Sequence, residues 1–144
     1  MKIFTIGFTQ KTAEQFFTTL KQPGLLRVVD VRLNNVSQLA GFTKKYDLKY
    51  FLREICHIDY VHLPVLAPIK EILDAYKKNG GDWQTYERLF LDLMAMRKVE
   101  SSVDKVVISG GCLLCSEATP EHCHRRLVAE YLQRHWADVC IQHL

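Results

Sequence analysis

The chain has 144 residues, of which 48% are hydrophobic and 24% are charged, and its formal net charge at pH 7 is +3. These values are typical of one soluble globular domain, and no segment has the roughly 20 consecutive apolar residues that a membrane helix needs. The excess of positive charge is small and spread along the chain, so it does not identify a nucleic-acid-binding protein.

The cysteine content and the first residues indicate the cellular compartment. Five cysteines are present, an odd number in a chain that is too large to depend on disulfides, so we expect reduced thiols. The segment Met1–Ile6 lacks the long apolar stretch of a signal peptide and is typical of a short strand. A cytoplasmic protein with no membrane partner is therefore expected.

The first half of the chain alternates apolar stretches with helical patterns. Strands are predicted at residues 3–8, 25–31 and 58–63. A helix is predicted after Thr12, which can cap it, up to Pro23-Gly24. A second helix is predicted over Asp47–Cys56, where hydrophobic residues recur at helical spacing. The polar stretch 34–43 before it is expected to be a loop.

The second half continues the same alternation. Helices are predicted over residues 69–78, 83–98 and 120–134. The last of these is expected to begin with Thr119 as its N-cap and Pro120 at the first helical position. A fourth strand is predicted from Asp104 through Val106–Ile108, interrupted at Gly110-Gly111 and continued by Cys112–Cys115. Ala137–Ile141 is predicted to form the last strand.

This order of elements favours an α/β fold: a single domain over residues 1–144, with a mostly parallel sheet and helices on both faces in a Rossmann-like three-layer arrangement. In such folds ligands bind outside the carboxyl ends of the strands, where the strand order reverses. We therefore expect Gly7-Phe8, Asp30–Arg32, His62 and Cys115–Glu117 to lie along one edge of the sheet. The start of the last helix is expected to join them.

The segment 115–126 carries the densest chemistry, with thiols, carboxylates, imidazoles and guanidinium groups. The positive end of a helix dipole would lower the pKa values of both Cys123 and His124, which makes the thiol a better nucleophile and the imidazole a neutral base. Arg125 adds a planar fork suited to phosphate or carboxylate. The structural alternative is that Cys123 is a small buried apolar residue and that the pair Arg126–Glu130 is a helix salt bridge.

Zinc is the obvious competitor for these side chains. Cys112 and Cys115, followed by Cys123 or His124, offer four candidate ligands. In a strand, however, the sulfurs of residues 112 and 115 would point to opposite faces about 10 Å apart. We therefore predict neither a metal nor another cofactor, although a turn at Gly110-Gly111 would restore the zinc hypothesis.

Five short motifs, in this order along the chain, together resemble a known family. They are Thr5-Ile6-Gly7, Val29-Asp30-Val31-Arg32, His62-Leu63-Pro64, Leu113-Leu114-Cys115-x-Glu117 and Cys123-His124-Arg125. The chain resembles, over nearly its whole length, the bacterial and archaeal family filed as domain of unknown function 488. Many members have a histidine where this chain has Phe8, which suggests a subgroup that is also marked by Leu39–Phe42.

This resemblance implies an α/β fold, a cytoplasmic protein and a set of motif positions, but no substrate. The motif positions that it carries over are Asp30, Arg32, Cys115, Glu117, Cys123, His124 and Arg125. What the site does has to be inferred from the chemistry of these residues.

The residues favour an enzyme, or a site of enzyme ancestry, that binds a small anionic ligand such as a nucleotide or phosphorylated compound. The expected catalytic residues are Cys115, Glu117, Cys123, His124 and Asp30. The expected ligand-binding residues are Arg32, Arg125, Gly7, Phe8 and His62. Two alternatives stay open. One is a non-catalytic module that binds nucleic acid or another ligand through Lys44, Lys45, Lys49 and Arg53, and the other is a thiol redox switch.

Overall fold

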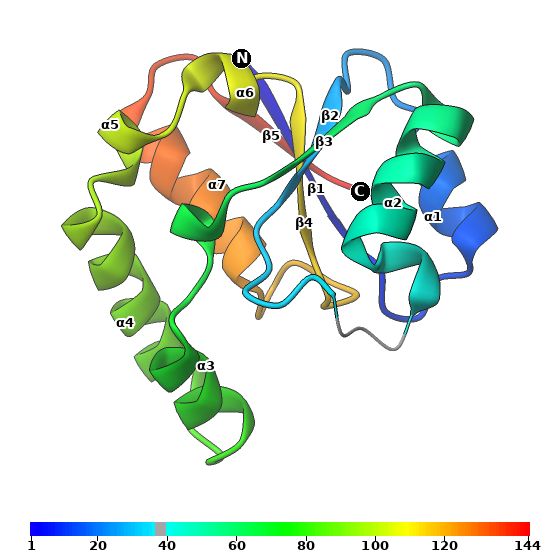
Figure 1. Cartoon of the computed structure of the whole chain (residues 1–144). Helices are drawn as coiled ribbons and strands as arrows, with labels where there is room; N and C mark the ends of the chain where they lie inside the picture. The colour runs from blue at the N-terminus through cyan, green and yellow to red at the C-terminus, as the bar shows by residue number, and fades with distance from the viewer. Residues whose placement is uncertain (37–39) are drawn as a thin grey trace.

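The computed structural model describes residues 1–36 and 40–144, and at its centre lies a sheet of parallel strands (Figure 1). The strands are β1 (Lys2–Gly7), β2 (Arg27–Asp30), β3 (Asp59–His62), β4 (Gly111–Cys115) and β5 (Cys140–His143). Their spatial order is β3-β2-β4-β1-β5, and each pair of neighbours is parallel. The predicted parallel α/β fold is confirmed. Leu39, one of the residues Leu39–Phe42 that mark the predicted subgroup, lies outside the described residues.

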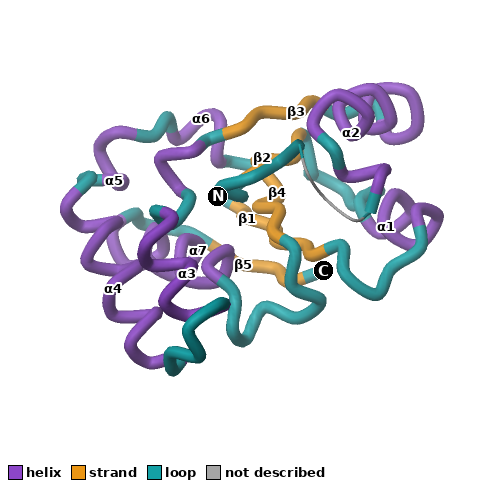
Figure 2. The backbone as a smooth tube through the Cα atoms, turned by 60° about the horizontal axis from the view of Figure 1, so that its bottom comes forward, coloured by secondary structure: helices purple, strands orange, loops and turns teal. Residues whose placement is uncertain are grey.

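Helices cover both faces of this sheet (Figure 2). One layer contains α1 (Ala13–Thr19), α2 (Lys45–Phe51) and the π-helical turn Leu52–Cys56 that continues α2. The other layer contains α3 (Lys70–Lys77), α4 (Trp83–Met96), α5 (Val99–Ser102), α6 (Lys105–Ile108) and α7 (His124–His135). In Figure 1 the helical hairpin of α3 and α4 extends past the carboxyl edge of the sheet.

The core consists of two clusters, one on each face of the sheet. Because side chains alternate along a strand, β4 sends Leu113 and Cys115 into the cluster that contains α4 and α7. Cys112 and Leu114 enter the cluster that contains α1 and α2. The predicted separation of Cys112 from Cys115 is therefore confirmed.

Two helices begin as their sequences require. Thr12 accepts a hydrogen bond from Gln15 N, and the Gln15 side chain accepts one from Thr12 N, so α1 begins with the capping box at the predicted residue. The Asp82 side chain accepts from Thr85 N and caps the start of α4. No helix in the described part of the chain has both the length and the apolar character that crossing a membrane requires.

The prediction of a strand at Val106–Ile108 is wrong, because these residues form the short helix α6. Asp104 caps this helix by accepting from Val106 N, and Val106 is 73% exposed, unlike a residue in a covered strand. Gly110, with a φ of +71°, then turns the chain into β4. β2 is shorter than predicted, and β5 lies later in the chain.

The predicted start of the last helix is also wrong. α7 begins at His124, and Cys123 occupies the N-cap position instead of Thr119. The stretch before it stays in a loop because side chains of the helix bind its backbone: Arg126 donates to the carbonyl oxygens of Pro120 and Glu121. Helix propensity after Thr119 is thereby overridden by hydrogen bonds from a side chain five and six residues further along the chain.

Candidate functional site

The carboxyl ends of four strands bring the predicted site residues to one edge of the sheet. Gly7 at the end of β1 pairs in register with Cys115 at the end of β4. Asp30 at the end of β2 pairs with Leu114 on one side and with His62 of β3 on the other. β4 lies between β1 and β2, so its last residue, Cys115, lies at the point where the strand order reverses. The predicted alignment along one edge is confirmed.

The loop of residues 116–122 packs directly on the end of β1. Thr9 N donates to Ser116 O at 3.0 Å. A Cβ atom at Gly7 would lie 1.6 Å from the carbonyl oxygen of Glu117, so only glycine allows this approach. The same Glu117 oxygen accepts a 2.7 Å hydrogen bond from Arg125 Nη1. Gly7 therefore positions the loop and does not carry any reactive group itself.

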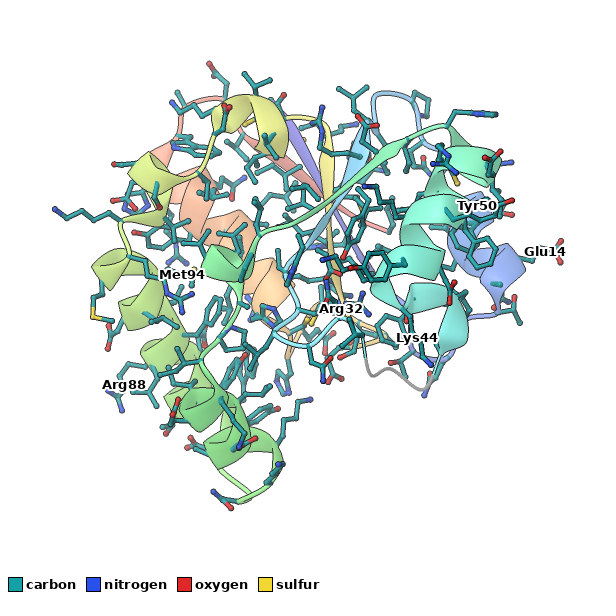
Figure 3. The ribbon with its side chains drawn as sticks, in the orientation of Figure 1. Glu14, Arg32, Lys44, Tyr50, Arg88 and Met94 are labelled. Atoms are coloured by element: carbon teal, nitrogen blue, oxygen red, sulfur yellow. The ribbon has the colours of Figure 1, made fainter. Side chains whose placement is uncertain are left out.

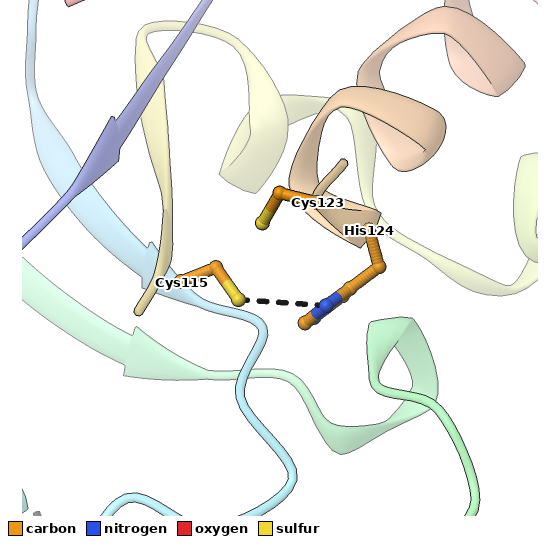
Figure 4. Close-up of side chains that lie close together, drawn as sticks. All are labelled: Cys115, Cys123 and His124. Carbon is orange, nitrogen blue, oxygen red and sulfur yellow. Dashed lines mark hydrogen bonds between the residues drawn. The ribbon is translucent and has the colours of Figure 1, made fainter. Parts of the chain in front are cut away.

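A thiol and an imidazole form the centre of the site (Figure 4). Cys115 Sγ lies 3.4 Å from His124 Nδ1, and both residues are buried. His124 Nε2 lies 2.7 Å from the backbone oxygen of Val31. Since a carbonyl oxygen only accepts, Nε2 carries the proton of this contact and Nδ1 faces the sulfur. The arrangement is that of a nucleophile, a base and a group that orients the base.

Arg125 contacts Cys123 from the protein interior. Its side chain is fully buried, and Nη1 donates to Cys123 Sγ at 3.3 Å as well as to Glu117 O. Its Nε and Nη2 atoms are buried without a hydrogen-bond partner, and Arg125 forms no ion pair with a carboxylate of the described residues. A buried cation is costly without a compensating negative charge. The guanidinium group therefore favours ionisation of the neighbouring thiols.

The two thiols share this effect unequally. A hydrogen bond from Cys123 lowers the pKa of Cys115 in spite of burial, with a further contribution from the charge of Arg125. Burial raises the pKa of Cys123, and the negative charge of Cys115 raises it further. The predicted lowering at Cys123 is thus wrong, because Cys123 is buried against another thiol. Burial lowers the pKa of His124, in the predicted direction.

Asp30 and Arg32 form a buried ion pair beside this centre. Arg32 Nε and Nη2 lie 2.9 and 2.8 Å from the two carboxylate oxygens of Asp30, and Nη2 also donates to Thr43 O. Tyr60 Oη donates to Asp30 at 2.6 Å. The carboxylate of Asp30 is therefore fully occupied in holding Arg32, which Figure 3 shows at the lower end of the sheet.

The two other predicted ligand-binding residues contact Arg32 and do not line the pocket described below. The Phe8 ring lies 5.5 Å from the guanidinium carbon of Arg32. His62 Nε2 lies 2.8 Å from the backbone oxygen of Arg32. Both residues thus help to position Arg32. In the described part of the chain, neither residue contacts Cys115 or Cys123.

A pocket of about 160 Å³ opens above the thiols. Its lining residues include the trio Cys115, Cys123 and His124, together with other polar and charged residues. The other lining residues are Arg32, Leu33, Asn34, Pro68, Leu73, Tyr76, Lys77, Trp83, Tyr86, Ser116, Glu117 and His122. Lys77 and Glu117 form an ion pair that joins α3 to the loop before α7.

The aromatic wall of this pocket was missed by the sequence analysis. Trp83 stacks on Tyr86 with ring centroids 5.2 Å apart and on His122 at 4.9 Å, while Tyr76 lies 5.0 Å from Tyr86. The sequence pattern of residues 83–98 predicts a helix and does not by itself indicate a pocket wall. The available signal was the concentration of aromatic residues on both sides of the Gly80-Gly81 break.

The basic residues of the nucleic-acid alternative lie elsewhere. Lys45 and Lys49 belong to α2, Arg53 to its π-helical continuation, and Lys44 directly precedes α2. These elements pack on the other face of the sheet from Cys115, and none of the four residues lines the pocket. The alternative therefore has no physical connection to the thiols.

Comparison with known proteins gives one match. The family model described as Domain of unknown function DUF488 matches residues 12–132. This range includes the ends of β2, β3 and β4, the loop after β4 and most of α7. No curated protein and no solved structure matches the chain.

Proposed function

We propose a function for this chain from the geometry of its site. The chain belongs to the DUF488 family, whose description assigns no activity. The proposal is an enzyme that uses Cys115 as a nucleophile toward a small anionic substrate bound in the aromatic pocket. The observation that carries it is the 3.4 Å contact between Cys115 Sγ and His124 Nδ1, with His124 held by Val31 O. No cofactor is required for this chemistry.

The contacts support a defined proton transfer. As Cys115 Sγ attacks an electrophilic atom of the substrate, its proton passes to His124 Nδ1, and the imidazolium is stabilised by the Val31 carbonyl oxygen. A bond from sulfur to the substrate forms, the bond to the leaving group breaks, and the proton at Nδ1 moves to the leaving group. Water then hydrolyses the covalent intermediate. Arg125 stabilises the thiolate through Cys123.

The pocket supports a small substrate. An apolar cavity of about 150 Å³ accommodates benzene, so the 160 Å³ here admits one ring or a group of similar size. Arg32 and Lys77 line the pocket, each in an ion pair with a carboxylate, and Arg32 Nη1 is buried without a hydrogen-bond partner. An anionic group beside Arg32 and a planar group against Trp83 would fit these walls. Of a whole nucleotide, only one part would enter.

Selective alkylation tests the nucleophile. Treatment of metal-free protein with iodoacetamide near pH 7 is expected to modify Cys115 several-fold faster than a small-molecule thiol, because the hydrogen bond from Cys123 lowers the pKa of Cys115. The rate should reach half its maximum below the ordinary thiol value of about pH 8.5. Peptide mass spectrometry in a Cys140→Ser background, which removes an exposed thiol, assigns the modified residue.

A matched pair of histidine variants separates the base from general effects. His124→Gln is expected to slow alkylation of Cys115 by at least about tenfold, since general-base groups contribute about 10²–10⁴ to catalysed rates. His135→Gln, at an exposed histidine of the same helix, should leave the rate unchanged. If Cys115 reacts no faster than the free thiol, the nucleophile role is rejected.

A second candidate function, a thiol redox switch, is favoured by the approach of two sulfurs. The sulfur atoms of Cys115 and Cys123 lie within 4.8 Å of each other. With a hydroperoxide as oxidant, the Cys115 thiolate would attack the peroxide oxygen to give a sulfenic acid and an alcohol. The Cys123 thiol would then displace water from that sulfenic acid and form a disulfide.

Stoichiometric peroxide tests this switch. The wild-type protein is expected to lose two thiols and gain an internal disulfide between residues 115 and 123, which peptide mapping would detect. Cys123→Ala should instead stop at the sulfenic acid of Cys115 or proceed to the sulfinic acid. Intact thiols in the wild-type protein after this treatment would argue against the switch.

A further inference from the structure

We propose that Cys115, Cys123 and His124 form a zinc-binding site whose fourth coordination position is open to the pocket. The inference goes beyond the proposed nucleophile, because it concerns a metal-bound state of these side chains and holds whether or not Cys115 is catalytic. It also differs from the ligand set that the sequence suggested, since Cys112 lies on the other face of the sheet.

The distances support a tetrahedral ion. Zinc binds sulfur at about 2.3 Å and imidazole nitrogen at about 2.0–2.1 Å, which places neighbouring ligand atoms roughly 3.5–3.8 Å apart. Cys115 Sγ and His124 Nδ1 are already 3.4 Å apart. All three ligand atoms of the trio lie within 4.8 Å of one another. Contraction of the trio from at most 4.8 Å to these spacings would complete the geometry.

The orientation of His124 supports the same conclusion. Histidines that bind metals donate their other ring N–H to a carboxylate, a backbone carbonyl or water, which fixes the tautomer that leaves one nitrogen free. His124 Nε2 has this contact with Val31 O, at 2.7 Å. The lone pair of Nδ1 is therefore directed toward Cys115 Sγ, the contact that the dashed line in Figure 4 marks.

Charge balance also supports a divalent ion. Two thiolates neutralise the charge of Zn²⁺, and a neutral imidazole adds none. Arg125 Nη1 donates to Cys123 Sγ at 3.3 Å, a contact that favours the thiolate, and no carboxylate of the described residues pairs with this buried arginine. Metal binding would exchange the two thiol protons for the ion, so the site would gain no net charge beside Arg125.

The fourth position determines the class of site. Structural zinc sites have four protein ligands, whereas sites with three protein ligands keep one position for water or substrate. Cys115, Cys123 and His124 all line the pocket, so the open position faces it. Glu117, the nearest lining carboxylate in the sequence, is engaged by Lys77. A small anionic ligand or water is therefore the expected fourth ligand.

Titration of chelator-treated protein with Co²⁺ provides the first test. We expect a single equivalent to bind and to produce thiolate-to-cobalt charge-transfer absorption together with the visible bands of a tetrahedral ion. One equivalent of Zn²⁺ should remove these bands and protect Cys115 and Cys123, but not exposed Cys140, from alkylation. Protons should be released on binding, since thiols must ionise. Absence of thiolate-to-cobalt absorption would overturn the proposal.

Variants provide the second test. Cys115→Ser, Cys123→Ser and His124→Ala are each expected to weaken Zn²⁺ binding by at least about 100-fold, more than the 10–100-fold effect typical of residues that only orient the ligands. Cys140→Ser is the matched control and should bind as the wild type does. Unchanged binding in a Cys115→Ser/Cys123→Ser double variant with a native circular dichroism spectrum would refute the site. Alkylation of metal-free protein tests the proposed nucleophile separately, so either hypothesis can fail alone.

Discussion

Replacement of Gly7 with alanine is expected to destabilise the protein by about 1–3 kcal/mol, the typical cost of forcing extra atoms into a packed region. The new Cβ atom would lie 1.6 Å from Glu117 O and 3.0 Å from Arg125 Nη1. A backbone carbonyl cannot rotate away as a side chain can, so the loop after β4 has to move. Urea unfolding of the variant and the wild type measures the difference.

The same substitution is expected to disturb the thiols. Arg125 Nη1 donates to both Glu117 O and Cys123 Sγ, so displacement of the loop alters the position of the guanidinium group. We therefore expect slower alkylation of Cys115 in folded Gly7→Ala protein. Gly41→Ala is the matched control, since a Cβ atom there meets nothing within 4 Å. Equal stability of Gly7→Ala and Gly41→Ala would contradict this account of the loop.

The sheet could be predicted because its sequence signals are local and agree with one another. The almost continuous apolar run that includes β2 is typical of a strand covered on both faces, and it is covered. Once the strands are taken as parallel, Gly7, Asp30, His62 and Cys115 have to meet at one edge. The register of the strand pairs confirms this meeting, which local sequence patterns alone could predict.

The errors arose where hydrogen bonds from side chains to nearby backbone atoms, two to six residues apart, override the strand or helix pattern. Val106–Ile108 has the composition of a strand, but the cap of Asp104 and the positive φ of Gly110 make it a helical turn. Thr119-Pro120 has the composition of a helix start, but hydrogen bonds from Arg126 hold that stretch in a loop. Neither set of contacts can be inferred from composition or spacing alone.

The site was predicted in its membership more than in its roles. The residues that meet at the thiols were identified, because the chain places them at a strand end and a helix start. The contact of Arg125 with Cys123 Sγ could not be predicted, nor could the fact that Cys115 is the thiol with the lowered pKa. Both depend on burial and on the positions of atoms a few ångströms apart. The pocket wall formed by α3 and α4 depends on how a helical hairpin packs, which no local pattern encodes.

Asp30→Asn is expected to destabilise the protein by about 3–5 kcal/mol, the cost of removing one partner from a buried ion pair. Four donors converge on this carboxylate: Oδ1 accepts from Arg32 N and Nε, and Oδ2 accepts from Arg32 Nη2 and Tyr60 Oη. The amide nitrogen of asparagine would replace one of these acceptors with a donor. The charge of buried Arg32 would then lose its compensating partner.

The outcome separates a positioning role of Asp30 from a catalytic one. Urea unfolding should show the large loss for Asp30→Asn and little change for Asp74→Asn, whose partners Lys70 and Lys78 are exposed. Adding Tyr60→Phe removes one of the conflicting donors, so the double variant should lose less stability than the sum of the single variants. If Asp30 acts by holding Arg32, folded Asp30→Asn should keep the fast alkylation of Cys115. Wild-type stability combined with loss of that reactivity would instead place Asp30 in the chemistry.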